Sequence, residues 1–287
     1  MAEKLVVYEI NDFDTKNAND KFYFNTLAEH FSKHPFVTKP HRHDFYIIVY
    51  FSSGTGIHTI DFMKYIVSPG SIFFLFPGQV HNWSLSPETE GRILFFKKEF
   101  IEDYFNKKIT SFPLFHAKYQ LHQIDNKKIK EQLSGLLEDV EREYQNESVS
   151  LEVIRDYLDI LIIKLGFLFL SSENISSSPG IWHIQKLDEL IDESYMEHRP
   201  PAFYAKELNF SVKYLNDLCK KYLNKTTSQL IHDRIILEAK RLLTHDDLSI
   251  KEIADRLNFE DHAYFTRLFK KIVGTTPGAF RIKMKSD

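Results

Sequence analysis

The stretch that decides the fold is LSIKEIADRLNFEDHAYFTRLFKKIVGTTPGAFR, residues 248–281. Ser249 is a residue type that caps helix N-termini, and apolar residues then recur at helical spacing for two turns. Asn258 tolerates the left-handed backbone of a helix C-cap, and Asp261 can cap a second helix that runs to about Ile272. The stretch therefore predicts two short helices joined by a tight turn.

The second of these helices has one apolar and one polar face. The residues expected in the core are Tyr264, Phe265, Leu268 and Phe269, and those expected on or beside the opposite face are His262, Ala263, Thr266 and Arg267. A helix pair whose second member carries small polar and basic residues outside has the geometry of a helix-turn-helix that enters a DNA major groove. An ordinary helical hairpin in an all-helical domain is the alternative that this stretch alone leaves open.

A repeat upstream favours the DNA-reading interpretation. Eight residues precede similar residues of the decisive stretch by 50 positions: Tyr214, Leu215, Leu218, Cys219, Lys220, Lys221, Thr226 and Leu230. The preceding helix and turn repeat at 49 positions, so we expect a one-residue insertion in the first turn of the second helix. Residues 234–243 (RIILEAKRLL) are rich in helix formers and predict a rigid connecting helix. Two units on one helix can enter successive major-groove faces about 34 Å apart.

This segment, roughly residues 184–283, resembles the DNA-binding domain of the AraC/XylS family of bacterial transcription regulators. The match is carried by Arg234, Ala239, Leu242, Leu243, Ile250, Ile253, Ala254, Phe259, Tyr264, Phe265, Arg267, Phe269, Lys270, Lys271, Gly274, Thr276, Pro277, Phe280 and Arg281. The sequence departs from the family at Asn258, where Gly is usual, and at Cys219, where Phe is usual. Asn can adopt the same backbone, whereas Cys219 is expected to loosen the core of the first unit.

The resemblance also implies which residues face DNA. In the first unit they are Lys213, Asn216 and Asp217, and in the second His262, Ala263, Thr266 and Arg267. By residue chemistry Arg267 suits guanine, Asn216 adenine, Asp217 the N4 amine of cytosine and Ala263 the methyl of thymine. Lysines expected at phosphates, which position without specifying, are Lys220, Lys221, Lys270 and Lys271. Two alternatives stay open: a phosphate or intradomain contact for Arg267, and a surface or Arg-pairing role for Asp217.

Length and composition set the outer limits. At 287 residues, with 43% hydrophobic and 27% charged residues, the chain suits about two globular domains. No run approaches the roughly 18 apolar residues of a membrane span, and the N-terminus lacks the order of a signal peptide. The single cysteine, Cys219, excludes an intramolecular disulfide and fits a reducing compartment. We therefore expect a cytoplasmic protein with no membrane partner.

The distribution of charge bears on DNA binding more than the net charge of −3 does. Residues 181–287 hold 18 Lys or Arg and 16 Asp or Glu, a charge of +2, which leaves −5 for the remainder. Because +2 is weak for a DNA-binding domain, affinity must come from locally placed Lys and Arg and from having two reading units.

Residues 45–85 read differently, as short strands rich in Ile, Val, Phe and Tyr separated by Gly and Pro turns. That pattern predicts a small antiparallel barrel or sandwich. The region resembles the cupin barrel that AraC-type regulators carry as an effector domain, through His41, His43, Gly54, Gly56, Gly70, Pro77, Gly78, His81 and Asn82.

Three of these residues are histidines, and two of them, His41 and His43, lie two apart on a strand and so face one side. Together with His81 they could form a three-imidazole site suited to zinc, iron, copper or nickel. Enzymatic cupins usually add a carboxylate shortly after the second histidine, where this chain has Ile47 and Ile48. We therefore assign no metal and no cofactor. The effector-binding residues expected instead are His41, His43, His81 and Trp83; a barrel filled by its own aromatic side chains that binds nothing is the alternative.

Helical patterns follow the barrel, at residues 99–106, 125–145 and 151–170. The last two predict a helical pair whose wide apolar face covers the barrel, and the resemblance implies that any surplus forms a homodimer contact. Residues 171–180, SSENISSSPG, read as a linker, and a leading helix is expected over residues 184–196.

Together these patterns predict an α+β protein with a cupin-like effector-binding and dimerisation domain over 1–170, a linker over 171–180 and an AraC-type double helix-turn-helix domain over 181–287. The expected function is a non-enzymatic transcription regulator that binds double-stranded DNA and responds to an unidentified small molecule. A second copy of the chain is an expected partner, and RNA polymerase is a further candidate. The alternative is a metal-dependent cupin enzyme with a helical interaction tail.

Overall fold

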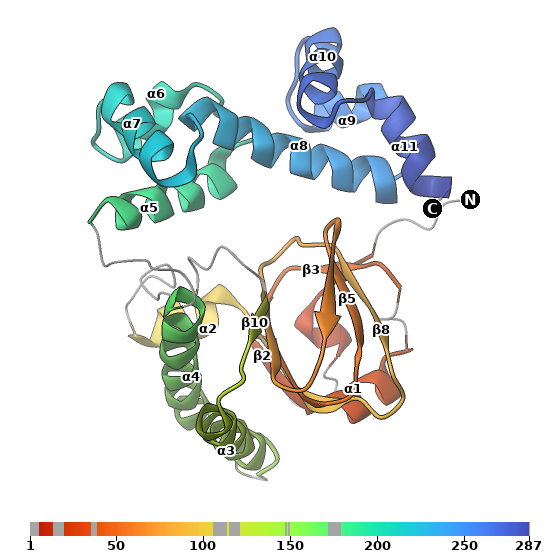
Figure 1. Cartoon of the computed structure of the whole chain (residues 1–287), viewed down its shortest axis with the longest axis vertical. Helices are drawn as coiled ribbons and strands as arrows, with labels where there is room; N and C mark the ends of the chain where they lie inside the picture. The colour runs from red at the N-terminus through yellow and green to blue at the C-terminus, as the bar shows by residue number, and fades with distance from the viewer. Residues whose placement is uncertain are drawn as a thin grey trace. The chain divides into compact units, whose positions relative to one another are not determined.

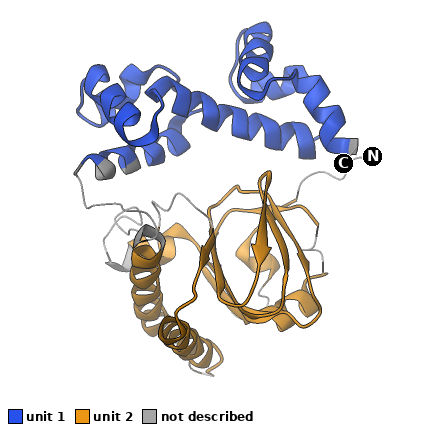
Figure 2. Cartoon of the chain, viewed as in Figure 1, with its two compact units in different colours: residues 1–5, 175–287 blue, residues 6–174 orange. Residues whose placement is uncertain are grey.

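The computed structural model describes residues 6–13, 20–35, 39–105, 114, 121–146, 148, 150–171 and 179–286. The chain divides into two compact units, residues 6–174 and 175–287 (Figure 2). The first unit is built on strands and the second is helical (Figure 1), which confirms the α+β class.

The strands that the structure describes in the first unit form two antiparallel sheets. Five strands pair in the order β10-β7-β4-β9-β2 and three in the order β6-β5-β8, while β1 and β3 form a short parallel pair. The strands are β1 (Val7–Tyr8), β2 (Phe22–Thr26), β3 (Arg42–His43), β4 (Tyr46–Ser53), β5 (Gly56–Ile60), β6 (Met63–Val67), β7 (Ser71–Leu75), β8 (His81–Leu85), β9 (Glu90–Phe96) and β10 (Leu121–Gln123). We call the two larger sheets and the core that they enclose the barrel.

Strand β4 shows why this region reads as nearly continuous apolar sequence. Alternate side chains point to opposite faces of a strand, and both faces of β4 are buried. Ile47 and Val49 join the core inside the barrel, whereas Ile48 and Tyr50 join a second core beneath the helices that follow. The five-stranded sheet is therefore shared between two cores.

In the described residues of this unit there are five named helical segments. They are η1 (Ile10–Asp12), α1 (Leu27–Lys33), α2 (Lys98–Phe105), α3 (Lys127–Tyr144) and α4 (Leu151–Ser171). Helix α3 begins after Asn126, whose side chain accepts a hydrogen bond of 3.2 Å from the backbone of Ile129. Helices α3 and α4 pack on each other and on the sheet, as the helical patterns predict.

The second unit has seven helices in its described residues. They are α5 (Pro179–Ser194), α6 (Pro201–Glu207), α7 (Val212–Leu223), α8 (Thr227–His245), α9 (Ile250–Arg256), α10 (His262–Val273) and α11 (Pro277–Ser286). Because α4 reaches Ser171 and α5 starts at Pro179, the ends of the expected linker are helical, and its residues 172–178 lie outside the described residues. Helix α5 accordingly begins earlier than the leading helix expected from residue 184.

Helix α8 is longer than the stretch of helix formers that predicts it. It starts at a capping box, in which Thr226 Oγ1 accepts from the backbone N–H of Gln229 and Gln229 Oε1 accepts from that of Thr226. These two polar residues fix the N-terminus of the helix a full two turns before Arg234. The connection between the two units of the repeat is therefore helical almost throughout.

The turns of the two helix-turn-helix units differ by one residue. Asn209 and Asn258 both take the left-handed backbone, with φ of 58° and 60°, and lie 49 positions apart. The N-cap residues of α7 and α10, Ser211 and Asp261, lie 50 apart. Glu260 is thus the inserted residue and belongs to the turn, so the expected insertion inside the helix was wrong. An insertion in the turn leaves the apolar register of α10 intact, whereas one inside the helix would rotate it.

Candidate nucleic-acid interface and barrel pocket

The second helices of the two helix-turn-helix units, α7 and α10, have the same pattern of exposure. In α7 the buried residues are Leu215, Leu218 and Cys219, and in α10 they are Phe265, Leu268 and Phe269. The Cys219 thiol lies in this core, 3.5 Å from Thr227 Oγ1. Each helix therefore packs one stripe inward and leaves the opposite face to solvent.

Tyr264 is an exception to the predicted core. It is 41% exposed, and its counterpart in the first unit, Tyr214, is 43% exposed, so assigning Tyr264 to the core was wrong. A tyrosine at the margin of an apolar stripe can pack its ring and keep its hydroxyl in water. Tyr214 does this while its hydroxyl lies 3.3 Å from His183 Nδ1.

Four residues of the second helix-turn-helix unit are expected to read DNA, and they share one exposed side of α10. Ala263 and Arg267 are exposed, and His262 and Thr266 are half-buried. His262 Nε2 lies 2.6 Å from Asp255 Oδ1 on α9, and the Thr266 hydroxyl donates to the carbonyl of His262 at 3.1 Å. Arg267 Nη2 donates to Asp261 Oδ2 at 3.2 Å, and two thirds of its side chain remains exposed. Of these four, Arg267 has the most reach from the helix.

The first helix-turn-helix unit places Lys213 and Asp217 on the corresponding exposed face of α7. Asn216 lies beside them, half-buried, and its Oδ1 accepts a 3.0 Å hydrogen bond from the backbone of Thr227. A bidentate contact to adenine uses both the oxygen and the NH₂ group of an asparagine. In this arrangement the oxygen is engaged with the start of α8, which leaves the NH₂ group for a contact with a base.

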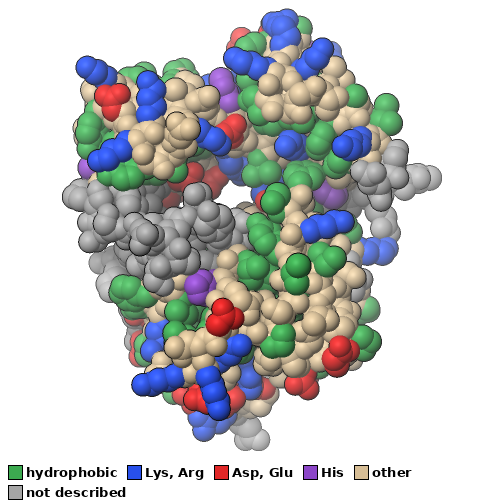
Figure 3. All heavy atoms as spheres, viewed as in Figure 1, with side chains coloured by type: hydrophobic (Ala, Val, Ile, Leu, Met, Phe, Trp, Pro, Cys, Tyr) green, Lys and Arg blue, Asp and Glu red, His purple; other side chains and the backbone are tan. Residues whose placement is uncertain are grey.

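The lysines expected at phosphates lie in the last turns of the two helices. Lys220, Lys221, Lys270 and Lys271 are all exposed. Figure 3 shows Lys and Arg side chains distributed over the visible face of the helical unit, among hydrophobic and acidic ones. On that face, positive charge is therefore local and does not form a broad basic surface.

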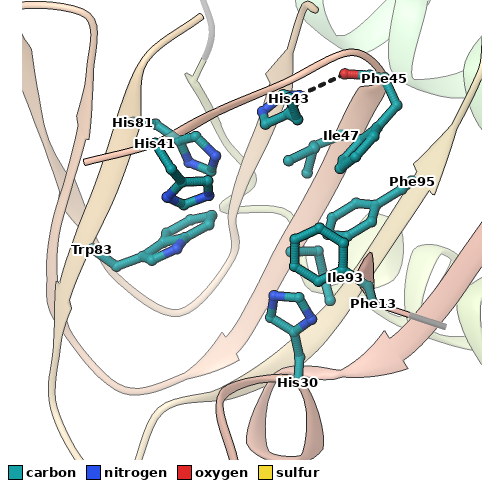
Figure 4. Close-up of a pocket in the computed structure, with 10 residues that line it drawn as sticks. All are labelled: Phe13, His30, His41, His43, Phe45, Ile47, His81, Trp83, Ile93 and Phe95. Atoms are coloured by element: carbon teal, nitrogen blue, oxygen red, sulfur yellow. Dashed lines mark hydrogen bonds between the residues drawn. The ribbon is translucent and has the colours of Figure 1, made fainter. Parts of the chain in front are cut away.

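The barrel brings together all four residues predicted to contact an effector. His41, His43, His81 and Trp83 are buried side chains that line one cavity, with His41 and His81 facing each other (Figure 4). The other lining residues are Phe13, His30, Phe45, Ile47, Ile93 and Phe95. The cavity measures about 10 Å³, which is room for about one water molecule. Aromatic side chains therefore fill most of the interior.

Hydrogen bonds fix which nitrogen of two histidines carries the proton. His41 Nδ1 lies 2.8 Å from the carbonyl of Lys39, and His43 Nδ1 lies 2.7 Å from that of Phe45. A carbonyl only accepts, so both Nδ1 atoms carry hydrogen and both Nε2 atoms are left as acceptors. His81 Nδ1 shares a 3.1 Å hydrogen bond with His58 Nε2.

Several polar atoms at the cavity lack partners. Among the described residues, His43 Nε2, His81 Nε2 and Trp83 Nε1 are buried with no hydrogen-bond partner. An unsatisfied buried polar group costs about 1–3 kcal/mol. The cavity wall therefore favours an occupant that can form hydrogen bonds.

Burial keeps the cavity's imidazoles neutral. Desolvation lowers the pKa of His41 to about 4 and those of His43 and His30 to about 3. The same cause lowers the pKa of His58 and of His81 well below 6.5, with neighbouring histidines adding to the effect. At neutral pH the cavity therefore presents uncharged rings.

Comparison with known proteins finds a family model that matches each of the two compact units. The chain matches the family model of the AraC-like ligand binding domain over residues 23–154 and that of a helix-turn-helix domain over residues 204–283. It is 23% identical over 247 residues to the HTH-type transcriptional activator RhaR of Mannheimia succiniciproducens, covering 84% of this chain and 86% of that protein. It is 25% identical over 248 residues to the activator RhaS of Salmonella schwarzengrund, with the same coverage.

The chain belongs to the AraC/XylS family of transcription regulators. Among solved structures it is similar to fatty-acid-bound ToxT of Vibrio cholerae, at 15% identity and a TM-score of 0.43, covering 93% of this chain and 97% of that one. It is also similar to the C-terminal domain of the response regulator yesN of Fusobacterium nucleatum, at 30% identity and a TM-score of 0.32, covering 33% of this chain and 93% of that one. Among its described residues, this AraC/XylS-family regulator has no helix that is both long and apolar enough to cross a membrane.

The histidines of this AraC/XylS-family barrel do not converge as metal ligands do. No group of three His, Cys, Asp or Glu side chains in the described part of the chain is placed to hold a metal ion. The ring centroids of His41 and His43 are 6.5 Å apart, although each lies within 5.0 Å of His81. The rings instead meet one another tilted or edge-on, and His43 stacks on Phe45.

Sequence reasoning missed two histidines of this cluster. His58 stacks on Trp83 with centroids 3.9 Å apart, and its strand position, two before the buried Ile60, could have placed it inside the barrel. His30 comes from α1, in a part of the sequence with no clear pattern, and its Nδ1 lies 3.0 Å from the Tyr23 hydroxyl. No local sequence signal predicts the contact between His30 and Tyr23.

Proposed function

We propose that this regulator reads DNA with α7 and α10 and that a small-molecule effector bound in the barrel controls it. The observation that carries the DNA-reading part is the pair of helix-turn-helix units on α8, whose second helices share one pattern of buried and exposed residues. The proposed readers are Lys213, Asp217 and Asn216 through its NH₂ group, and His262, Ala263, Thr266 and Arg267. The four lysines in the last turns of these helices are proposed to contact phosphates.

Each part of the chain has a proposed role in this function. Residues 1–170 would bind the effector and a second copy, residues 171–180 would connect, and residues 181–287 would bind DNA. Because the curated relatives are named transcriptional activators, we propose activation, with RNA polymerase as the partner in that step. We propose no catalytic activity.

The proposed effector must displace side chains in order to enter. A cavity of about 10 Å³ is far smaller than the roughly 300–1,000 Å³ of ordinary ligand pockets. Buried atoms without partners on His43, His81 and Trp83 supply the reason for a polar occupant, and the surrounding rings supply stacking surface.

Selection of bound duplexes from random DNA tests the proposal directly. The full chain should enrich one sequence containing two half-sites about one helical turn apart. Arg267→Ala should weaken binding to that sequence by roughly 1–3 kcal/mol and relax one base position. Lys64→Ala, which removes an exposed charge from β6 in the other unit, is the matched control and should bind as wild type. Enrichment of no sequence over competitor DNA at moderate salt would refute the DNA-reading role.

Repeating the selection with a panel of small metabolites tests the effector part. An effector should change the affinity of the wild-type chain for the enriched duplex and should not affect His43→Phe, which fills the cavity and removes an acceptor. If every compound leaves affinity unchanged, the barrel is a structural domain filled by its own side chains.

Metal analysis separates the proposal from the alternative of a metal-dependent cupin enzyme. Stoichiometric transition metal that survives dialysis, and that is lost in His41→Ala, His43→Ala and His81→Ala, would favour the enzyme. The separation of the His41 and His43 rings argues against that result.

A further inference from the structure

One pair of positions distinguishes the two reading helices. The second unit has Asp261 at the N-cap of α10 and Arg267 one and a half turns later. At the equivalent positions, 50 residues earlier, the first unit has Ser211 and Asp217. The helix with an acidic N-cap, α10, thus carries the arginine on its exposed face. The helix with a serine N-cap, α7, has no arginine at that position.

Asp261 uses its two carboxylate oxygens for two different contacts. Oδ1 accepts hydrogen bonds from the backbone N–H groups of Ala263, at 2.8 Å, and Tyr264, at 3.0 Å. Oδ2 accepts from Arg267 Nη2 at 3.2 Å. The backbone hydrogen bond from Tyr264 is the main reason that the pKa of Asp261 lies below its usual range, so the group is ionised at neutral pH.

A serine can also cap this kind of helix terminus. Ser211 does so in α7, where its hydroxyl accepts from the backbone of Tyr214 at 3.1 Å. Serine and aspartate are comparable N-cap residues, so capping alone does not call for a carboxylate. The second oxygen of Asp261 contacts the arginine, and an ion pair this exposed contributes little to stability.

The contact changes what the arginine can bind well. Arginine has five N–H donors, and this contact uses a donor on Nη2, which leaves others for a ligand. An adjacent carboxylate repels phosphate, whereas the O6 and N7 atoms of guanine are uncharged acceptors in the geometry that a guanidinium fits. A paired arginine is therefore better suited to a base edge than to the DNA backbone.

We propose that Asp261 is a positioning residue that makes Arg267 a reader of guanine and disfavours its use as a phosphate anchor. This inference rests on the proposed role of α10 as a reading helix. It favours guanine reading over the phosphate role that the sequence leaves open for Arg267, and it gives the intradomain contact with Asp261 a part in that reading.

Two substitutions of Asp261 test the proposal. Asp261→Ser installs the cap that the first unit uses, and Asp261→Asn keeps the side-chain shape without the charge. Binding of the full-length variants is measured on the wild-type enriched duplex and on duplexes with each base changed in turn, over a range of salt concentrations. Circular dichroism checks that helix content is unchanged, and Asp261→Asn carries the test if Asp261→Ser is poorly folded.

Both variants should lose roughly tenfold of the discrimination at one guanine. Affinity for non-specific DNA should rise, and the slope of log affinity against log salt should steepen by about one unit, as expected when a freed cation contacts a phosphate. Glu260→Gln is the matched control, since it removes one negative charge from the same turn, while the carboxylate that pairs with Arg267 is that of Asp261. It should retain the guanine discrimination.

Arg267→Ala separates failure of this inference from failure of the proposed function. If Arg267→Ala loses preference at one base while both Asp261 variants keep that preference and the wild-type salt slope, the positioning role is wrong and the reading role stands. If Arg267→Ala leaves every base preference unchanged, Arg267 is not a reader and both statements about it are wrong.

Discussion

Single residues inside the barrel make its stability depend on pH. The pKa values of His30, His41 and His43 lie at about 3, 4 and 3 in the folded barrel, against 6.5 for an ordinary histidine. Below pH 6.5 the unfolded chain therefore binds protons that the folded chain does not. Each such group costs about 1.4 kcal/mol per pH unit. The stability of the barrel should be full above pH 6.5 and should fall steeply as the pH drops towards 4.

Urea unfolding followed by Trp83 fluorescence in a Trp182→Phe background measures this dependence. The midpoint should decrease sharply between pH 6.5 and 5. The decrease should be about a fifth shallower in His43→Gln, which removes one of the five barrel histidines whose pKa is strongly lowered. A midpoint that is constant over that range would show that these rings are accessible to protons in the folded state.

At this scale, the sequence predicts residues that follow a periodic pattern. His41, His43, His81 and Trp83 reach one cavity because alternation along strands fixes which side chains point inward. Tyr264 was misplaced because an amphipathic ring at the edge of a helical stripe satisfies either side, and only the packed neighbours decide.

At the scale of elements, the turns of the reading units depend on two asparagines with positive φ. Asn258, with φ of 60°, also donates from Nδ2 to the carbonyl of Met196, while Arg199 donates to the carbonyls of Leu257 and Asn258. Asn258→Ala should lower the free energy of unfolding by about 1–2 kcal/mol, because a Cβ is strained in this conformation and the amide contact is lost.

Asn258→Gly is the matched control for that change. It loses the same contact with Met196 but relieves the backbone, so it should lie within about 0.5 kcal/mol of wild type in thermal unfolding. Equal destabilisation by alanine and glycine would mean that the side-chain contact, and not the backbone conformation, matters at this turn.

Elements with a local cause could be predicted, and their details depended on contacts that sequence does not display. The caps Ser249 and Asp261 and the left-handed Asn258 follow from residue chemistry and are confirmed. Glu260 could not be assigned to the turn from the repeat alone, because a one-residue shift fits either side of the N-cap. The N-caps that the structure shows, Ser211 and Asp261, decide it.

At the scale of the whole molecule, the outward face of α4 gives a reason for a second copy. Val153, Ile160, Ile163 and Phe167 recur at spacings of seven, three and four residues and are exposed, Phe167 to 65%. Such a continuous apolar stripe suits a two-fold contact with the same stripe of another chain. We therefore predict a homodimer that forms through α4.

Ile160→Glu combined with Phe167→Glu should convert the dimer to monomer in sedimentation, with dimer affinity reduced on the order of a hundredfold or more, because each contact would bury unpaired charge. Ile66→Glu on β6, where the isoleucine is 77% exposed outside this stripe, is the control and should leave the dimer intact.

The charged α4 variant should also bind its duplex more weakly, since two chains with two reading units each hold DNA more tightly than one. If wild type is monomeric at every concentration tested while still selecting one duplex, α4 is not the dimer contact, and the two units of a single chain account for DNA recognition.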